Sequence, residues 1–396
     1  MKKINKIIFL AIIIRLLIMP WFYHPDIKSQ YFHFQFLQKG VLNIYSYIEQ
    51  NKDNLPNTDT FNYLPLTYFT FGTNHFISQI FMPKDYPLWL NDWGVEKNNY
   101  FNLPIFLLIL KLPYLFLDIG IAYLLYKLFP KKKLHSIWLF NPITIYLIYI
   151  LGNFDILPSF LTLLAFYFLN NKKNFYCYLS LGTAVAIKMY PLLFLPFFLF
   201  YKKENLKQKV LNLLFLSLPL IISITPFLTN TYFINSFLGS GLTQKILEYK
   251  ILNIPIYPII YIVIFLLFLK NKDKQKSFYK SIFYLMIFFF ALIKFHPQWL
   301  IWFLPFAIYP LKSIKKIIIP FIFYLLLFFF YIFLINDQFL NWGHLIPINA
   351  DFLLVNTPYN LVRYRFLFNP LVIQQYTQFS MIIFSLIIVY LYEKNN

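Results

Sequence analysis

Long apolar stretches alternate with short polar connections along most of the chain. A helix needs about 20 apolar residues to cross a bilayer, because each residue adds about 1.5 Å along the helix axis. Stretches of this kind predict membrane-spanning helices at residues 6–22, 101–129, 135–150, 154–170, 209–228, 251–270, 280–295, 298–311, 317–335 and 371–391. The pattern therefore predicts an all-α, polytopic membrane protein.

One further apolar stretch, residues 175–200, carries lysine pairs at both ends, at positions 172–173 and 202–203. Since basic residues beside short loops mark the cytoplasmic side, this stretch should turn back within the bilayer, with its apex at residues 189–191. Backbone at such a turn must be buried in protein or line a wet cavity. Counting the hairpin as two short helices raises the prediction to about twelve, with both termini inside.

The polar and mixed segments between the spans are predicted to lie on one outer face. The first outer loop covers residues 23–100, and within it residues 26–38 and 62–82 mix aromatic and polar positions. Both are expected to be amphipathic helices on the membrane surface. Residues 229–250 and 336–370 are predicted to be further outer loops.

Composition supports the membrane assignment. The 396 residues are 59% hydrophobic and 22% aromatic, and only 13% are charged. A soluble chain of ordinary composition has about a quarter charged residues and cannot bury this much apolar surface. We therefore expect residues 1–396 to form a single integral membrane domain. The lone cysteine, Cys177, excludes a disulfide framework and a cysteine-rich zinc module.

The formal net charge is +20, and the distribution of these charges along the chain indicates the membrane topology. Lysines cluster in alternate connections between the apolar stretches, whereas most acidic residues lie in the other connections. Because Lys and Arg near short loops mark the cytoplasm, the first outer loop and any active site there belong on the extracytoplasmic side. We expect membrane lipids as surroundings and no nucleic-acid partner.

Charged residues in or beside membrane helices are costly, so each is a functional candidate. An outward-opening catalytic cavity would gather those at the outer ends of the spans, which are Asp26, Asp155, Lys188 and His296. Asp26, in WFYHPD, is either a general base for an acceptor hydroxyl or a helix N-cap. Asp155, in GNFDILP, either binds a sugar hydroxyl or caps the next helix, and capping is slightly favoured.

The cationic candidates have two readings each. Lys188, at the predicted apex, either meets an anion such as a phosphate or extends to the interface, and the hairpin favours the anion. His296, in KFHPQWLIW, serves phosphate recognition or proton transfer, or it anchors the turn. Arg363, in NLVRYRFLFNP, either binds a phosphate through two parallel hydrogen bonds of its guanidinium or binds lipid headgroups. Lys111 and Asp118, seven apart in one helix, are expected to satisfy polar groups of neighbouring helices.

Several common catalytic motifs are absent from the sequence. It contains no glycine-rich phosphate loop, HExxH, CxxC pair or GxSxG elbow. Nucleotide hydrolysis, zinc proteolysis and serine hydrolysis therefore lack their usual supports. A sugar donor would have to arrive as a lipid, because no soluble domain is available for a nucleotide sugar. No DxD carboxylate pair is visible, and we expect neither a metal nor a cofactor.

Five motifs, in order, resemble those of the GT-C integral membrane glycosyltransferases, and most closely the dolichyl-phosphate-glucose-dependent glucosyltransferases. They are PDIKSQYFHFQF, NYLPLTYF, KLPYLFLDIG, FNPITIYLIYILGNFD followed by AIKMYPLLFLP, and FHPQWLIWFLP. Together they cover roughly residues 10 to 310. The chain departs from the family at Leu64, where a doubled proline is more common.

The resemblance implies a GT-C-like fold and an inverting transfer of a hexose from a polyprenyl-phosphate sugar to an acceptor, lipid-linked or otherwise, at the outer face. The residues implied are Asp26 as catalytic base, Lys188, His296 and Arg363 as ligands of the donor phosphate, and Tyr63, Asp155 and Gln298 as substrate contacts. A membrane transporter or flippase for a lipid-linked glycan is the alternative. Transporters usually have paired broken helices, whereas this chain has one hairpin, so the asymmetry favours an enzyme.

Overall fold

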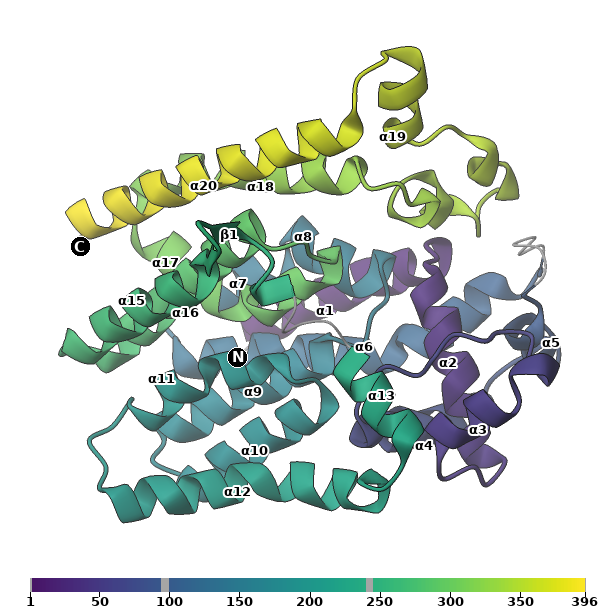
Figure 1. The fold of residues 1–396 in the computed structure, drawn as a ribbon, viewed down its shortest axis with the longest axis horizontal. Coiled ribbons are helices and arrows are strands. Elements are labelled where there is room, and N and C mark those ends of the chain that lie inside the picture. The colour runs from purple at the N-terminus through teal and green to yellow at the C-terminus, as the bar shows by residue number, and fades with distance from the viewer. Residues whose placement is uncertain (1, 94–99, 240–244, 396) are drawn as a thin grey trace.

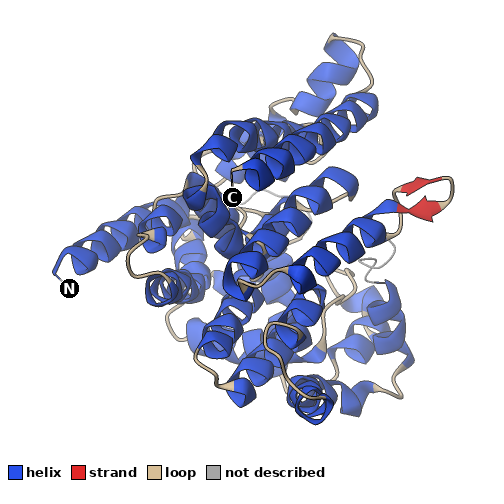
Figure 2. Cartoon of the chain, turned by 90° about the vertical axis from the view of Figure 1, so that its left-hand side faces the viewer, coloured by secondary structure: helices blue, strands red, loops and turns tan. Residues whose placement is uncertain are grey.

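The computed structural model describes residues 2–93, 100–239 and 245–395, and the chain is nearly all-α (Figure 1). In these ranges the strands are β1 (Lys250–Ile251) and β2 (Ile254–Pro255), which pair as one short antiparallel hairpin (Figure 2). Parts of two predicted outer loops, at 94–99 and 240–244, lie outside the described residues.

The helices differ widely in length. They are α1 (Lys2–Ile18), α2 (Pro25–Gln38), α3 (Ile44–Gln50), α4 (Pro65–Gln79), α5 (Tyr86–Asn91), α6 (Leu103–Leu128), α7 (Leu134–Leu139), α8 (Pro142–Ile145), α9 (Ile156–Asn170), α10 (Asn174–Ile187), α11 (Leu195–Leu199), α12 (Leu206–Ile224), α13 (Thr231–Gly239), α15 (Ile256–Lys270), α16 (Lys274–Leu292), α17 (Leu304–Ser313), α18 (Ile318–Phe333), α19 (Pro358–Asn360) and α20 (Pro370–Lys394). Single turns of 3-10 or π-helix bridge several of them: η1 (Met19–Trp21), η2 (Lys52–Asn54), η3 (Tyr146–Ile150), η4 (Tyr190–Phe194), η5 (Thr225–Phe227), η6 (Pro297–Trp302), η7 (Lys315–Ile317), η8 (Gln338–Leu340), η9 (Trp342–Leu345), η10 (Ala350–Leu354) and η11 (Leu361–Arg365).

Four helices in the described ranges are long and apolar enough to cross a membrane. They are α6, α12 with its extension to Phe227, α18 with the turn that precedes it, and α20. The bent pair of α1 and α2 would make a fifth span, and α9, α10, α15 and the segment Tyr190–Leu199 are apolar but shorter. The chain is therefore an integral, multi-pass membrane protein, and the larger set of about twelve membrane helices, some of them short or re-entrant, stays a prediction.

Prolines explain why several predicted spans are divided. The stretch 135–150 consists of α7, α8 and η3, and α8 begins at Pro142. The stretch 298–311 consists of η6 and α17, with Pro305 in the first turn of α17. Proline is favoured in the first turn of a helix and disrupts a helix interior, so each of these prolines starts a new element within an apolar stretch.

A sharp bend joins α1 to α2 and places Asp26 in the first turn of α2. The two helices meet at 85°. Pro25 occupies the first position of α2, and the imidazole of His24 caps this helix by accepting a hydrogen bond from the amide of Asp26, at 3.2 Å. The N-cap reading of Asp26 is therefore wrong, because His24 takes that place.

The helices expected on the membrane surface are present as α2 and α4, but α2 is an internal helix. Its buried side chains point in all directions, from Ile27 and Gln30 to Phe34 and Phe36. The neighbours α3, α4 and α5 pack against it. Aromatic residues on every face suit such an enclosed helix better than a surface helix with one apolar face.

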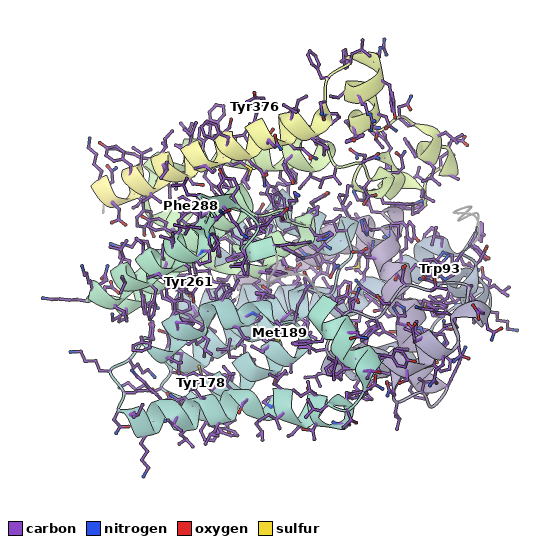
Figure 3. The ribbon with its side chains drawn as sticks, in the orientation of Figure 1. Trp93, Tyr178, Met189, Tyr261, Phe288 and Tyr376 are labelled. Carbon is purple, nitrogen blue, oxygen red and sulfur yellow. The ribbon has the colours of Figure 1, made fainter. Side chains whose placement is uncertain are left out.

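The apolar stretch 175–200 reverses direction at the predicted position. Helix α10 ends at Ile187, and a new turn, η4, starts at Tyr190. The hydroxyl of Tyr178, near the start of α10, donates a hydrogen bond of 3.2 Å to the carbonyl of Phe198. The second arm therefore runs back along the first, and Figure 3 labels Met189 at the break and Tyr178 on the first arm.

Buried polar bonds join the first helices, as expected for Lys111 and Asp118. The ammonium of Lys111 donates to the carbonyls of Met19, Phe22 and Tyr149 at 3.1, 2.5 and 2.7 Å. It thus ties the bend between α1 and α2 to the end of η3. All three groups lie on different elements from Lys111, so its predicted role in satisfying groups of neighbouring segments is confirmed.

Asp118 has the corresponding role about two turns further along α6. Its carboxylate accepts hydrogen bonds from Arg15 of α1, Trp138 of α7 and Tyr149 of η3, at 2.5, 2.5 and 2.6 Å. Both Arg15 and Asp118 are fully buried. A buried charge needs such partners, so this network holds four elements in one arrangement.

The segments predicted as outer loops gather toward one end of the molecule. Figure 1 shows α2 to α5, α13 and α19 toward the right of the view, and the C-terminus at the opposite end. Between them, α16 forms the core, with every residue from 277 to 292 buried among its neighbours.

Candidate active site

A cavity of about 330 Å³ opens where the bend before α2 meets the break after α10. It is lined by Asp26, Asn62, Tyr63, Leu64, Ile187, Lys188, Met189, Phe237, Lys245, His296, Gln298, Trp299 and Trp302. Five residues predicted from the sequence are in this set, namely Asp26, Tyr63, Lys188, His296 and Gln298. Segments far apart in the chain thus bring one carboxylate and several nitrogen groups to the same space.

The carboxylate of Asp26 is supported by two amides and remains accessible. Its Oδ2 accepts hydrogen bonds from Asn153 at 3.3 Å and from Gln298 at 3.4 Å. Its Oδ1 lies 3.5 Å from Nδ1 of His24. The side chain is still 37% exposed, so a hydroxyl entering the cavity can reach it. Such a carboxylate has the position that a general base requires.

Lys188 lies beside Asp26 in the lining but is engaged by a second carboxylate. Its Nζ donates to Oδ1 of Asp155 at 2.5 Å, and the buried Asp155 also accepts from Nε1 of Trp302 at 2.9 Å. The Lys188 side chain is 19% exposed. The pair is neutral overall, but an ammonium has three N–H groups, so Lys188 can still donate toward the cavity.

Asp155 lies behind Lys188, outside the cavity lining. It occupies the N-cap position of α9, but its side chain makes no capping hydrogen bond. Its contacts in the structure are those to Lys188 and Trp302. Direct contact with a sugar stays a prediction that this geometry does not support.

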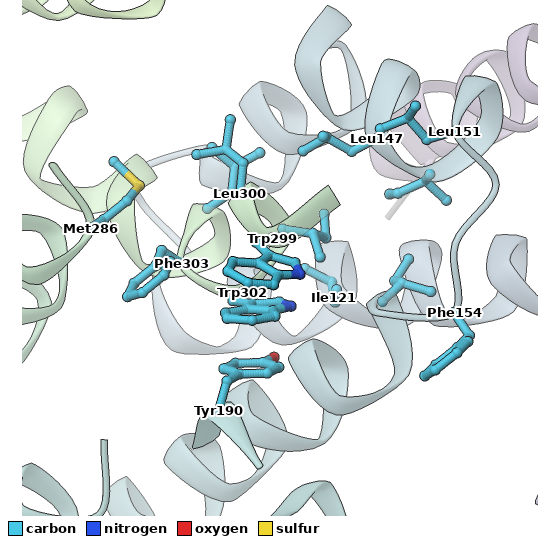
Figure 4. Packing of buried hydrophobic residues seen from close by; sticks show 14 of the residues in the cluster. Ile121, Leu147, Leu151, Phe154, Tyr190, Met286, Trp299, Leu300, Trp302 and Phe303 are labelled. Carbon is cyan, nitrogen blue, oxygen red and sulfur yellow. The ribbon is translucent and has the colours of Figure 1, made fainter. Parts of the chain in front are cut away.

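Two tryptophans of the cavity lining, Trp299 and Trp302, belong to a stack of three aromatic rings (Figure 4). The ring of Tyr190 lies parallel to that of Trp302 with centroids 4.2 Å apart, and Trp302 stacks on Trp299 at 4.8 Å. Lys188 lies 5.4 Å from the Trp302 ring centroid. Stacking fixes the indole of Trp302, so its N–H stays directed at Asp155 and the ion pair keeps its place.

A second cation, Lys245, was not predicted from the sequence. Its Nζ lies 3.4 Å from Nε2 of His296 and 4.9 Å from the ring centroid of Trp299. In the described ranges no ion pair joins Lys245 to a carboxylate, whereas the neighbouring Lys294 is paired with Glu248 at 2.6 Å. The sequence feature that could have identified Lys245 is its position in a predicted outer loop, where basic residues are otherwise uncommon.

The surroundings of His296 favour its neutral form. Burial lowers the pKa of His296, the positive charge of Lys245 lowers it further, and Asp26 opposes them only in part. Burial also lowers the pKa of Lys245. An imidazole whose pKa lies below the usual range is mostly neutral at pH 7 and acts by hydrogen bonding. The positive charge on this wall of the cavity therefore comes from Lys245.

The structure does not bring Arg363 to this cavity. Arg363 lines a different cavity with Tyr359 and Leu367, and its guanidinium donates to the hydroxyl of Tyr359 at 3.5 Å. The same part of the chain that the structure describes contains no group of three or more His, Cys, Asp or Glu residues able to hold a metal ion. Independence of metals and cofactors stays a prediction.

Comparison with known families adds a finding from the sequence. Residues 119–228 match Glycosyltransferase family 87. The matched segment runs from the second half of α6 to the end of η5 and includes Asp155 and Lys188, but not Asp26 or His296. No curated protein and no solved structure matches the chain. The match supports a membrane glycosyltransferase of the GT-C type.

Proposed function

We propose that the protein is an inverting glycosyltransferase that moves a hexose from a polyprenyl-phosphate sugar to an acceptor hydroxyl at the outer face of the membrane. The observation that supports this most is the meeting of Asp26, Lys188, Lys245 and His296 at one cavity. A transfer of this kind needs a base for the acceptor and positive charge for the phosphate.

The acceptor reacts beside Asp26. Its hydroxyl oxygen attacks the anomeric carbon of the donor sugar while the Asp26 carboxylate takes the hydroxyl proton. The bond between that carbon and the phosphate oxygen breaks, and its electron pair leaves with the polyprenyl phosphate. A single displacement inverts the anomeric configuration. Asn153 and Gln298 hold the carboxylate in place during the step.

The leaving phosphate gains negative charge during this step. Lys245 offers an ammonium that no carboxylate of the described residues pairs with, His296 offers a neutral imidazole, and Lys188 offers its remaining N–H groups. Donors fixed in a site with little water stabilise developing charge by several kcal/mol. These three residues are therefore assigned to the donor phosphate, and Tyr63 and Gln298 to substrate contacts. Arg363 has no contact in this assignment.

The gathering of the predicted outer segments at one end supports an assignment of the site to the extracytoplasmic side. Asp26 of α2 and Phe237 of α13 line the cavity. Both helices lie on the other side of the molecule from the C-terminus (Figure 1). With the lysine-rich connections in the cytoplasm, the cavity opens on the extracytoplasmic side, where a lipid-linked donor and acceptor can enter from the bilayer. Residues 1–396 then form one membrane domain, with the hairpin of residues 175–200 re-entering the bilayer. No specific observation favours a flippase over this enzyme.

The test uses purified protein in lipid nanodiscs. It is incubated with a panel of polyprenyl-phosphate sugars and a membrane lipid extract, and the products are analysed by mass spectrometry. We expect one donor to yield a glycosylated product together with free polyprenyl phosphate, and NMR of the product to show the inverted anomer. Absence of transfer from every donor, or retention of configuration, would contradict the proposal.

A further inference from the structure

A second cavity adjoins the candidate active site and differs from it in charge. It measures about 410 Å³ and lies between α3 and α13. Asn62 lines both cavities. Small-molecule sites usually have volumes of about 300–1,000 Å³, so this space can hold a ligand of its own.

The lining of the second cavity consists mainly of amide, hydroxyl and aromatic groups. Its polar residues are Glu49, Thr60, Asn62, Tyr232, Asn235 and Ser236. The described lining includes no Lys, Arg or His, and the one carboxylate, Glu49, is paired with Lys52 at 2.7 Å. A phosphate would meet no free positive charge here, and a lipid chain would meet polar groups. The lining suits a neutral ligand that is rich in hydroxyls.

Hydrogen bonds orient the amide of Asn62, which both cavities share. Thr60 donates to Oδ1 of Asn62 at 3.0 Å, and Ser236 approaches the same oxygen at 3.2 Å. The oxygen is thereby occupied, and no bond within the described part of the chain uses the NH2 group of Asn62. This group is left to donate to a ligand that extends from one cavity to the other.

The wall of the second cavity is formed before any ligand arrives. Tyr45 is buried, and its hydroxyl donates to the carbonyl of Tyr63 at 2.6 Å. Its ring packs edge to face on Phe233 of α13, with centroids 5.0 Å apart. Tyr63 lines the first cavity, so a direct hydrogen bond links the walls of the two spaces. A preformed wall reduces the ordering that binding would otherwise require.

We propose that the second cavity binds a neutral sugar unit of the acceptor, and that the acceptor is therefore a glycan with at least one sugar besides the one that reacts. This inference rests on the proposed transfer reaction. The reacting hydroxyl lies at Asp26 in the first cavity, and the neighbouring sugar lies beside Asn235 and Tyr232, with Asn62 between them. The donor phosphate stays with the cations of the first cavity.

Saccharide binding tests the inference without requiring transfer. Saturation-transfer NMR on the purified protein would use methyl glucosides, methyl mannosides and the corresponding disaccharides as probes, with inorganic phosphate as competitor. We expect disaccharides to bind and phosphate not to displace them. Asn235→Ala should weaken their binding by about fivefold or more, because it removes an amide that can make two hydrogen bonds.

The matched control is Asn54→Ala, since Asn54 is an exposed asparagine of the same outer region that lines neither cavity. It should bind the disaccharides as the wild type does. Binding of none of the saccharides by the wild type, displacement by phosphate, or equal binding by Asn235→Ala and wild type would each overturn the inference.

Transfer kinetics then separate this inference from the proposed function. With an active donor, Asn235→Ala should raise the KM for the acceptor and leave the KM for the donor unchanged. If transfer occurs and neither constant changes, the second cavity is not an acceptor site, although the enzyme assignment stands. If no donor is used but disaccharide binding depends on Asn235, the saccharide site stands and the proposed reaction falls.

Discussion

Asp26 is both supported by hydrogen bonds and accessible from the cavity. It is held by the amides of Asn153 and Gln298, and about a third of its side chain is open to the cavity. Support without full burial holds the carboxylate in place and leaves it accessible to a hydroxyl. A single substitution at Asp26 should therefore remove the carboxylate and leave the fold unchanged.

Asp26→Asn should lower kcat by about 10²- to 10⁴-fold, the usual contribution of a general base. The amide keeps the shape of the side chain and one oxygen for Asn153 or Gln298, so the thermal unfolding temperature should change little. Asp53→Asn, at an exposed aspartate outside the cavity, is the control. Wild-type turnover by the Asp26 variant would remove the base assignment.

Lys245→Ala should raise the KM for the donor by about ten- to a hundredfold, because hydrogen bonds to charged groups contribute about 1.5–3 kcal/mol. His296→Gln should have a smaller effect, since the lowered pKa of His296 leaves a neutral imidazole that an amide can replace as a hydrogen-bond donor. Donor titrations of both variants measure the difference.

Lys84→Ala serves as control for Lys245→Ala, because it removes one charge from an exposed site on the first outer segment. If it weakened donor use as much as Lys245→Ala, the effect would come from the overall field and not from contact with the phosphate.

Sequence alone predicted the types of residue at the site but not how they pair. Lys188 and Asp155 were separate candidates, and their ion pair joins residues 33 apart through tertiary packing. Lys245 lies in an outer segment that matches no motif, so it was missed. Arg363 was included for its chemistry alone, because sequence holds no information on the distance between the last outer loop and the cavity.

At the scale of elements, the close approach of α10 to α12 fixes where Lys188 emerges. A Cβ atom on Gly182 would come within 2.0 Å of the carbonyl oxygen of Leu216. Only glycine therefore allows this spacing. Since α10 ends just before Lys188, any shift of α10 moves the cation relative to Asp26.

Gly182→Ala should destabilise the protein by about 1–3 kcal/mol, as overpacking of a tight core usually does, and it should also lower activity. Thr183→Ala, at the next position on α10, should cost about 1 kcal/mol or less. Thermal unfolding in detergent measures both variants. Equal stability of Gly182→Ala and wild type would mean that the two helices are not in close contact.

Element boundaries were predictable where pairs of lysines flank an apolar stretch. The lysines at the two ends of the hairpin stretch predicted that it turns back, with its apex at residues 189–191, and the break lies at Lys188 and Met189. The division of residues 135–150 was not predicted. The stretch is apolar on average, and this average hides the break at Asn141 and Pro142. The internal position of α2 also depends on neighbours that the sequence does not reveal.

At the scale of the whole molecule, the charge pattern predicts a single orientation. We expect a cysteine at position 54 (Asn54→Cys), in a Cys177→Ala background, to react with a membrane-impermeant maleimide on intact cells or spheroplasts. A cysteine at position 272 (Lys272→Cys) should react only after permeabilisation. Both sites are exposed in the structure. The reverse pattern of labelling would place the cavity on the cytoplasmic side.

Because the base Asp26 and the cation Lys245 are separate groups of one cavity, the proposed reaction leaves the total charge of the cavity unchanged. Before reaction, the Asp26 carboxylate and the donor phosphodiester each carry one negative charge. Afterwards Asp26 is neutral, and the released phosphate monoester carries two. The Lys188–Asp155 pair contributes no net charge throughout. One unit of negative charge therefore moves from Asp26 to the phosphate beside the ammonium of Lys245. The total charge in the cavity stays constant, so no counter-ion has to enter or leave.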